Sequence, residues 1–175
     1  NVYLDRNGEV LWKDTGNENY RLVVDADEIS PYMYQATIAI EDRNFYNHIG
    51  VDFGALLRAT LSTLGGHGVQ GGSTLTQQLI KQVYFADEAA SENRGGLTRK
   101  IKELILAIEL EKIMDKDTIL VNYLNTINLG QNTLGVQSAS QRYFGKDVSE
   151  LTLSEGATIA GITQSPGNLN PITRF

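Results

Sequence analysis

Proline occurs at only three positions of this 175-residue chain: Pro31, Pro166 and Pro171. Because proline lacks a backbone donor and its ring clashes with the preceding helical turn, its absence from residues 32–165 leaves that long stretch free to form helices. Apolar residues recur there at helical spacing, and no later segment alternates like a strand. We therefore expect helices at about 31–41, 52–64, 74–84, 97–114, 116–127, 133–143 and 152–163.

The residues before Pro31 follow a different pattern. Two short apolar runs, at residues 2–4 and 10–12, flank the dipeptide Asn7-Gly8, which predicts a β-hairpin. Residues 22–24 predict one further short strand. The length suits one domain with a real core, so the expected fold class is a mainly α domain over residues 1–175 with a small N-terminal β-hairpin.

Composition excludes several classes of function. The chain has 15 Lys and Arg against 21 Asp and Glu, and the excess acid lies within residues 1–52, so no nucleic-acid partner is expected. It has no cysteine and only two histidines, His48 and His67, which rules out thiol catalysis and an HExxH zinc site. No apolar run approaches the ~18 residues that span a bilayer. The chain begins without an initiator Met or a signal peptide, so we expect a fragment of a longer protein.

The first polar motif is residues 41–50, Glu-Asp-Arg-Asn-Phe-Tyr-Asn-His-Ile-Gly, which follow the apolar run 36–40. A carboxylate at the end of a buried helix, such as Glu41, is partly removed from water, which suits a general base. Asp42 and Arg43 beside it can orient or anchor polar groups. A charged helix end that turns into a loop with structural ion pairs is the alternative interpretation.

The second motif is residues 71–81, Gly-Gly-Ser-Thr-Leu-Thr-Gln-Gln-Leu-Ile-Lys, at the end of a glycine-rich loop. A glycine loop that runs into a helix N-terminus presents free N–H groups and the positive end of the helix dipole, which suits a phosphate. It is not a Walker A loop, because no Lys stands between the glycines and Ser73. Gln77 and Lys81 share one face of the helix, with Gln78 beside them. An ordinary amphipathic helix capped at Thr74 explains the same residues.

The third motif is residues 99–103, Arg-Lys-Ile-Lys-Glu. Helical geometry places Arg99, Lys102 and Glu103 on one side, and apolar residues follow on that side, so we expect the middle of this helix to be buried. The densest basic patch of the chain lies at the same place and contains no acid: Arg94, Arg99, Lys100 and Lys102. A solvated helix face with i, i+4 ion pairs is the alternative.

Together the motifs supply two carboxylates, Glu41 and Glu103, a glycine loop and a basic cluster. This combination fits glycosyl transfer with an anionic leaving group. In that chemistry a carboxylate activates a sugar hydroxyl, and Lys and Arg stabilise the charge on a departing phosphate.

These motifs resemble the peptidoglycan glycosyltransferase domain, glycosyltransferase family 51, which occurs in class A penicillin-binding proteins and in monofunctional transglycosylases. Residues 119–125, 143–146 and 166–171 resemble later landmarks of the family, so the resemblance covers nearly the whole chain. Two positions depart from the family pattern. Val121 stands where a Glu is usual, and Gln82 stands where an Asn is frequent.

The resemblance implies a lysozyme-like, two-lobed fold in which residues 51–70 form a membrane-facing jaw. It implies polymerisation of lipid II into glycan strands, with inversion at C1 and release of undecaprenyl pyrophosphate. The expected partners are the lipid II donor and acceptor, the growing glycan strand, the membrane surface and inhibitors of the moenomycin type. The expected location is the extracytoplasmic face of the bacterial cytoplasmic membrane, with an N-terminal anchor helix and any C-terminal transpeptidase domain outside this chain.

Carried over position by position, the resemblance makes Glu41 the general base on the acceptor hydroxyl and Glu103 an assisting group at the pyrophosphate. Glu103 would act by orienting cations, by hydrogen bonding, or by holding a divalent cation such as Mg²⁺ or Mn²⁺. The remaining candidates bind the donor or shape the cleft: Asp42, Arg43, Phe45, His48, Ser73, Thr74, Gln77, Gln78, Lys81, Arg94, Arg99, Lys100 and Lys102.

Two other functions stay open at this stage. A lytic transglycosylase or muramidase would share the lysozyme-like fold and a catalytic Glu. Such an enzyme cleaves neutral glycosidic bonds and needs no cationic site for a pyrophosphate, so Lys81 and the basic patch favour the polymerase. A non-catalytic cell-wall binding module is the second alternative, and the presence of both Glu41 and Glu103 disfavours it.

Overall fold

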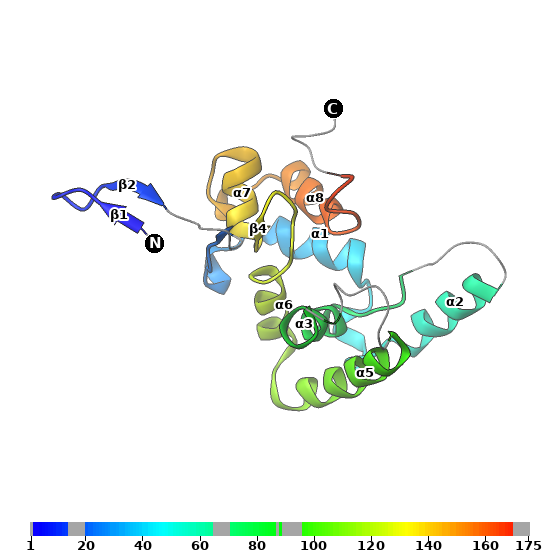
Figure 1. Ribbon diagram of the computed structural model, residues 1–175. Helices are drawn as coiled ribbons and strands as arrows, with labels where there is room; N and C mark the ends of the chain where they lie inside the picture. The colour runs from blue at the N-terminus through cyan, green and yellow to red at the C-terminus, as the bar shows by residue number, and fades with distance from the viewer. Residues whose placement is uncertain (1, 14–19, 65–70, 87, 89–95, 170–175) are drawn as a thin grey trace.

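The computed structural model describes residues 2–13, 20–64, 71–86, 88 and 96–169. Within them the chain is mainly helical, as the sequence predicts (Figure 1). The helices are α1 (Pro31–Glu41), α2 (Phe53–Leu64), α3 (Leu75–Tyr84), α5 (Gly96–Ile113), α6 (Lys116–Leu124), α7 (Val136–Phe144) and α8 (Leu153–Ile162). Short 3-10 turns accompany them: η1 (Ala26–Glu28) precedes α1, η2 (Phe45–Asn47) lies between α1 and α2, and η3 (Val148–Glu150) lies between α7 and α8.

Local chemistry sets where several helices begin. Pro31 occupies the first turn of α1, where a missing backbone N–H costs no hydrogen bond. At the start of α3, the Thr74 hydroxyl accepts from the backbone N–H of Gln77 at 3.2 Å. Thr152 and Glu155 form a reciprocal capping box at the start of α8. These starts lie within two residues of the predicted ones because caps act over a single turn.

Two pairs of short strands accompany the helices. β1 (Val2–Leu4) pairs antiparallel with β2 (Val10–Lys13), and the pair extends away from the helices (Figure 1). β3 (Tyr20–Arg21) pairs in parallel with β4 (Thr133–Leu134).

Two sequence predictions are wrong near these strands. Residues 22–24 are not a strand, because the N–H of Leu22 donates to Ser138 Oγ at 2.7 Å and the N–H of Val24 donates to Asn125 Oδ1 at 3.1 Å. Side chains thus take the hydrogen bonds that a neighbouring strand would make. The helix expected at 133–143 begins only at Val136, because the two preceding strand residues pair with β3 and Gly135, with a φ of 81°, turns the chain into the helix.

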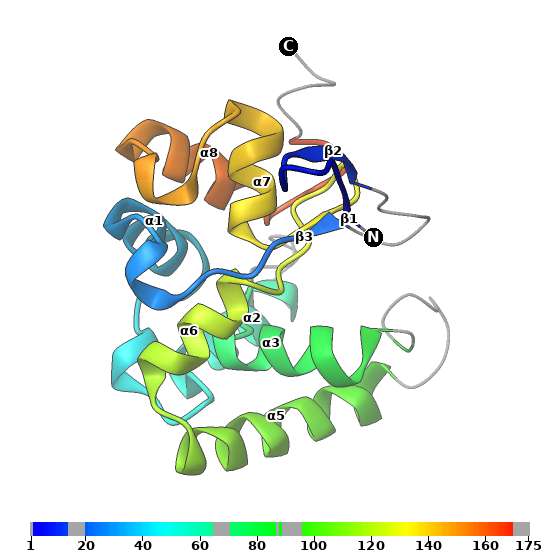
Figure 2. The same ribbon diagram turned by 90° about the vertical axis from the view of Figure 1, so that its left-hand side faces the viewer.

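The main core forms where α1 packs along α8, with α6 and α7 contributing to the same apolar cluster. Its largest fully buried side chains include Tyr123, Phe45 and Met33. Figure 2 shows α1, α7 and α8 in one half of the molecule and α3, α5 and α6 in the other. α3 packs against both α5 and α6. The backbone N–H of Leu75, its first residue, donates to Asp42 at the C-terminal end of α1, so these two helix ends lie close together.

The helix α2 extends to one side of this body (Figure 1). Two glycines permit close approaches around it. A Cβ on Gly72 would lie 2.9 Å from the Cβ of Ala59, so the loop before α3 lies directly against α2. Gly50 has a φ of 85°, and a Cβ there would lie 2.5 Å from the carbonyl oxygen of Ala107 in α5. None of the helices in the described part of the chain is long and apolar enough to span a membrane.

The prediction that the middle of α5 is buried all round is wrong. Only Glu103 and Ala107 are buried among its residues, whereas Ile101, Ile105 and Leu106 are exposed. α5 contacts the body chiefly through α3, and one neighbour can cover only one stripe of a helix.

Candidate active site

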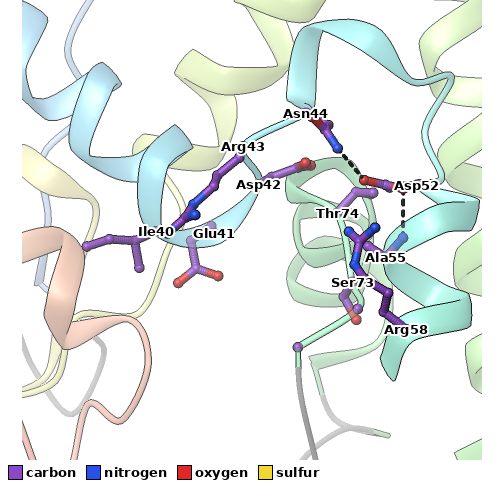
Figure 3. A pocket seen from close by; sticks show the side chains of 12 residues that line it. Ile40, Glu41, Asp42, Arg43, Asn44, Asp52, Ala55, Arg58, Ser73 and Thr74 are labelled. Carbon is purple, nitrogen blue, oxygen red and sulfur yellow. Dashed lines mark hydrogen bonds between the residues drawn. The ribbon is translucent and has the colours of Figure 1, made fainter. Parts of the chain in front are cut away.

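A cavity of about 380 Å³ opens between the C-terminal end of α1, the start of α2 and the loop before α3. Residues 40–44 line one side, and residues 71–74 with Asp52 and Arg58 line the other. In Figure 3, Glu41 lies across the opening from Ser73 and Arg58. The first and second sequence motifs therefore meet at this cavity.

Three side chains hold the carboxylate of Glu41. Gln78 Nε2 donates to Oε2 at 2.7 Å, Gln164 Nε2 donates to Oε1 at 2.6 Å, and the Thr163 hydroxyl also donates to Oε1. Gln78 comes from α3, whereas Thr163 and Gln164 follow α8. Donors from α3 and from the segment after α8 thus hold one carboxylate in a single orientation.

Tyr123 supports this arrangement from the core. Its hydroxyl donates to Oε1 of Gln78 at 3.2 Å, which turns the NH₂ group of that amide toward Glu41. Burial, followed by the nearby charge of Glu41, raises the pKa of Tyr123 well above its ordinary value. The hydroxyl therefore keeps its proton and remains a donor.

Asp42, His48 and Phe45 fasten the loop after Glu41 to the rest of the protein. Asp42 Oδ2 accepts from His48 Nε2 at 2.9 Å and from the backbone N–H of Leu75 at 3.1 Å. His48 Nδ1 lies 3.2 Å from Nζ of Lys116, and since an ammonium can only donate, Nδ1 accepts and Nε2 carries the proton. Phe45 is completely buried, with its ring edge-on to His48. Of these three candidates, only Asp42 lines the cavity.

Thr74 and Gln77 tie the start of α3, directly after the glycine loop, to Gly50. Both donate to the carbonyl oxygen of Gly50, Thr74 Oγ1 at 2.6 Å and Gln77 Nε2 at 3.3 Å. Both side chains are buried, so their first role is to hold the loop in place. Ser73, one residue earlier, is partly exposed at the cavity.

Lys100 joins the second and third motifs. Its Nζ donates to Ser73 Oγ at 2.7 Å, to Gln77 Oε1 at 3.0 Å and to Glu103 Oε2 at 3.3 Å. Arg99 pairs with Oε1 of Glu103, whose residue is only 1% exposed. Glu103 therefore pairs with two cations, of which Lys100 also contacts Ser73 at the end of the glycine loop.

Both carboxylate oxygens of Glu103 already have cationic partners within the protein. Arg99 pairs with one oxygen and Lys100 with the other. Among the described residues, no group of three or more acidic or histidine side chains is arranged to hold a metal ion. The described surroundings of Glu103, two cations and no second carboxylate, therefore do not fit Mg²⁺ or Mn²⁺.

Some basic candidates are not brought to the cavity. Lys102 Nζ lies over the ring of Phe85, 6.0 Å from its centroid, so the predicted grouping of Lys102 with Glu103 is wrong. Lys100, three residues before Glu103, is closer around the helix than Lys102, which is turned by roughly 100°. Lys81 is exposed and is not among the described residues that line the cavity. Arg94 lies outside the described residues.

Sequence reasoning missed several residues of the site. Arg58 and Asp52 line the cavity from the start of α2, and Asn44 Nδ2 donates to Asp52 Oδ2 at 3.0 Å. That bond, with one from the backbone N–H of Ala55, holds the pKa of Asp52 below its ordinary value. The only sequence signal for Arg58 was its place beside the apolar residues of a predicted amphipathic helix.

A family model described as Transglycosylase matches residues 7–175. The chain belongs to the transglycosylase family. The family predicted from the three motifs is thus confirmed, and so is its enzyme class, a peptidoglycan glycosyltransferase.

Proteins named penicillin-binding protein 1A are similar to this transglycosylase domain over most of its length. The protein of Escherichia coli (strain K12) is 46% identical over 156 residues, which are 89% of this chain and 18% of that protein. The protein of Clostridium perfringens (strain 13 / Type A) is 43% identical over 169 residues, covering 90% of this chain and 24% of that protein. The protein of Aquifex aeolicus (strain VF5) is 44% identical over 152 residues, which are 86% of this chain and 20% of that protein. The chain therefore spans only about a fifth to a quarter of the length of these relatives.

Proposed function

We propose that this domain polymerises lipid II into glycan strands, with Glu41 as the general base. The observation that carries the proposal is the carboxylate of Glu41, held by three donors at a cavity whose far side is the glycine loop. Glu41 takes the proton of the acceptor 4-hydroxyl, and that oxygen bonds to C1 of the donor sugar. The bond from C1 to the pyrophosphate breaks on the opposite face, so the configuration inverts and undecaprenyl pyrophosphate leaves with the electron pair.

The leaving group needs positive charge, and the cations at the cavity supply it beside the carboxylates of Glu41, Asp42 and Asp52. Ser73 follows the glycine loop and lies just before α3, where the positive end of the helix dipole favours an anion. The N–H groups of Leu75 and Gln77 are already bonded to Asp42 and Thr74, so the attraction comes from the dipole and the nearby cations. Lys100 donates to Ser73, and Arg43 and Arg58 line the same cavity. Glu103 keeps Lys100 and Arg99 in place, so it assists through them at the pyrophosphate.

We further propose that α2 faces the membrane. Its residues Phe53, Leu57 and Leu61 are 65%, 60% and 60% exposed and recur at intervals of four, so they form one apolar stripe. Such a stripe suits shallow contact with a bilayer surface, where a lipid-linked substrate resides. We place the domain at the extracytoplasmic face of the cytoplasmic membrane, with a lysozyme-like, two-lobed fold in which residues 51–70 are the jaw; residues 65–70 lie outside the described residues.

The experiment supplies the chain with lipid II in one reaction and with finished glycan strands in another. We expect polymer from lipid II, inhibition by a moenomycin-type phosphoglycolipid, and no strand cleavage. Cleavage of strands without polymerisation would identify a muramidase-like enzyme instead. Binding of either substrate without turnover would identify a cell-wall binding module, and both results contradict the proposal.

A further inference from the structure

A groove of about 660 Å³ lies between η1, α1 and α6, and it shares no lining residue with the cavity at Glu41. Much of its lining is apolar, with Pro31, Ile38, Leu120 and Val121 contributing from the two helices. Val121, one of the two positions that depart from the family pattern, therefore adds a methyl-bearing surface to the groove. The rings of Tyr34 and Tyr46 also line it, so we name it the Tyr34–Tyr46 groove.

The polar atoms of the Tyr34–Tyr46 groove are mainly acceptors. The hydroxyl of Tyr46 donates to Asp117 Oδ1 at 2.8 Å, and the hydroxyl of Tyr34 donates to the carbonyl oxygen of Ala26 at 2.8 Å. Both phenolic hydrogens are thus used within the protein. The phenol oxygens, the second oxygen of Asp117 and the carboxylate of Asp27 remain to accept hydrogen bonds from a ligand.

The charge of the groove is negative and uncompensated among the described residues. Its described lining contains two carboxylates, Asp27 and Asp117, and no Lys, Arg or His. Neither carboxylate has an ion-pair partner within the described part of the chain.

The negative charge of the groove contributes to raised pKa values of both tyrosines. Burial, followed by the charges of Asp117 and Asp27, raises the pKa of Tyr34. Burial, followed by the hydrogen bond to Asp117, raises the pKa of Tyr46 to about 12. A ligand in the groove thus meets two tyrosine side chains in a negative field, which favours a cation over a neutral or anionic group.

We propose that the Tyr34–Tyr46 groove docks a basic segment of a partner protein through an Arg or Lys side chain. The aliphatic stem lies along the apolar residues of α1 and α6, and the cationic head reaches Asp27 and Asp117. A guanidinium suits the site better than an ammonium, because it only donates hydrogen bonds and its plane stacks on aromatic rings. Acidic and phosphate-bearing segments are repelled by the same two carboxylates.

The test uses the 175-residue chain labelled with ¹⁵N and the peptide acetyl-Ala-Arg-Leu-Arg-Ala-amide, with a second peptide in which Gln replaces both Arg. We expect saturable shifts of the backbone amide signals of Tyr34, Gln35, Tyr46 and Val121 with the Arg peptide only. The double variant Asp27→Asn/Asp117→Asn should bind the Arg peptide about tenfold more weakly. Glu9→Gln, which removes a carboxylate from the loop between β1 and β2, is the matched control and should bind as the wild type does.

Three results would overturn the proposal. Equal shifts with the Gln peptide would mean that only apolar contact matters. Unchanged affinity in the Asp27→Asn/Asp117→Asn variant, with its amide spectrum still dispersed like that of a folded chain, would mean that the carboxylates do not bind the cation. Self-association of the chain through the same residues, seen in sedimentation without any peptide, would mean that the groove receives a second copy.

Discussion

The side-chain amide of Gln78 donates to Glu41 Oε2 at 2.7 Å while its oxygen accepts from the Tyr123 hydroxyl at 3.2 Å. Tyr123 is completely buried in the main core. The amide therefore links the buried core to the carboxylate that we propose as the base. A substitution at Gln78 can therefore disturb the orientation of the Glu41 carboxylate while Glu41 itself is kept.

Replacing Gln78 by Leu keeps the approximate side-chain volume and removes both hydrogen bonds. We expect kcat for lipid II polymerisation to fall about 10- to 100-fold with KM within about twofold, because the base loses its orientation and the substrate keeps its contacts. Tyr123→Phe, which removes only the more distant bond, should cost less. Steady-state kinetics measure both, and a raised KM with an unchanged kcat for Gln78→Leu would contradict the positioning role.

Lys100 and Lys102 lie two positions apart in α5 and make different contacts. Lys100→Met removes the donor that joins Ser73, Gln77 and Glu103, so we expect kcat/KM for lipid II to fall about 100-fold or more. Lys102→Met removes a cation that lies over Phe85 and should change kcat/KM by about twofold at most. Equal losses in the two variants would show that general positive charge matters rather than the contacts of Lys100.

A second pair of lysines tests the buried polar network behind the cavity. Lys116 contacts His48 Nδ1 and pairs at 2.8 Å with Glu111, whose side chain is only 7% exposed. Lys116→Met leaves that carboxylate without its cation, so we expect the free energy of unfolding to fall by about 2–4 kcal/mol. Lys112→Met breaks an exposed pair with Glu109 and should cost about 0.5 kcal/mol or less. Denaturant unfolding compares them, and similar losses would refute the importance of the network.

The apolar stripe of α2 gives a prediction about membranes. Leu57→Ser should weaken binding to vesicles of phosphatidylglycerol and phosphatidylethanolamine about tenfold, because one exposed leucine no longer enters the bilayer surface. The melting temperature should hardly change, since Leu57 is 60% exposed in the protein. Leu153→Ser alters an equally exposed leucine, 58%, at the start of α8 and should leave vesicle binding unchanged. Sedimentation with vesicles measures the binding of both variants. Equal losses of vesicle binding in the two variants would contradict a membrane contact through α2.

Much of the helical fold could be predicted because its determinants are local. Pro31, Thr74 and Thr152 each mark the start of a helix through interactions within one turn. The absence of proline from residues 32–165 allows the segments between them to be helical. The strand β4 was missed because it has two residues and its partner, β3, lies more than a hundred residues earlier. Pairing at that distance leaves no periodic pattern in a window of ordinary length.

The candidate site divides in the same way. Glu41 and Ser73 were found because each belongs to a motif continuous in sequence. Thr163 was missed because it reaches Glu41 from a position 122 residues away, and only the packing of α8 along α1 brings the two together. The sequence grouped Lys102 with Glu103, whereas the structure pairs Lys100 with Glu103. The cause is similar, because the packing of α5 against α3 decides which side of α5 is buried.

The most direct test of the account is the rate of lipid II polymerisation by Glu41→Gln. The amide keeps the shape of the side chain and can accept hydrogen bonds through its oxygen, but it is not a useful base. We expect the rate to fall by about 1,000-fold or more, with lipid II binding and the circular dichroism spectrum unchanged. A variant that folds, binds lipid II and still polymerises it at a rate within about tenfold of the wild type would contradict the assignment of Glu41 as the base.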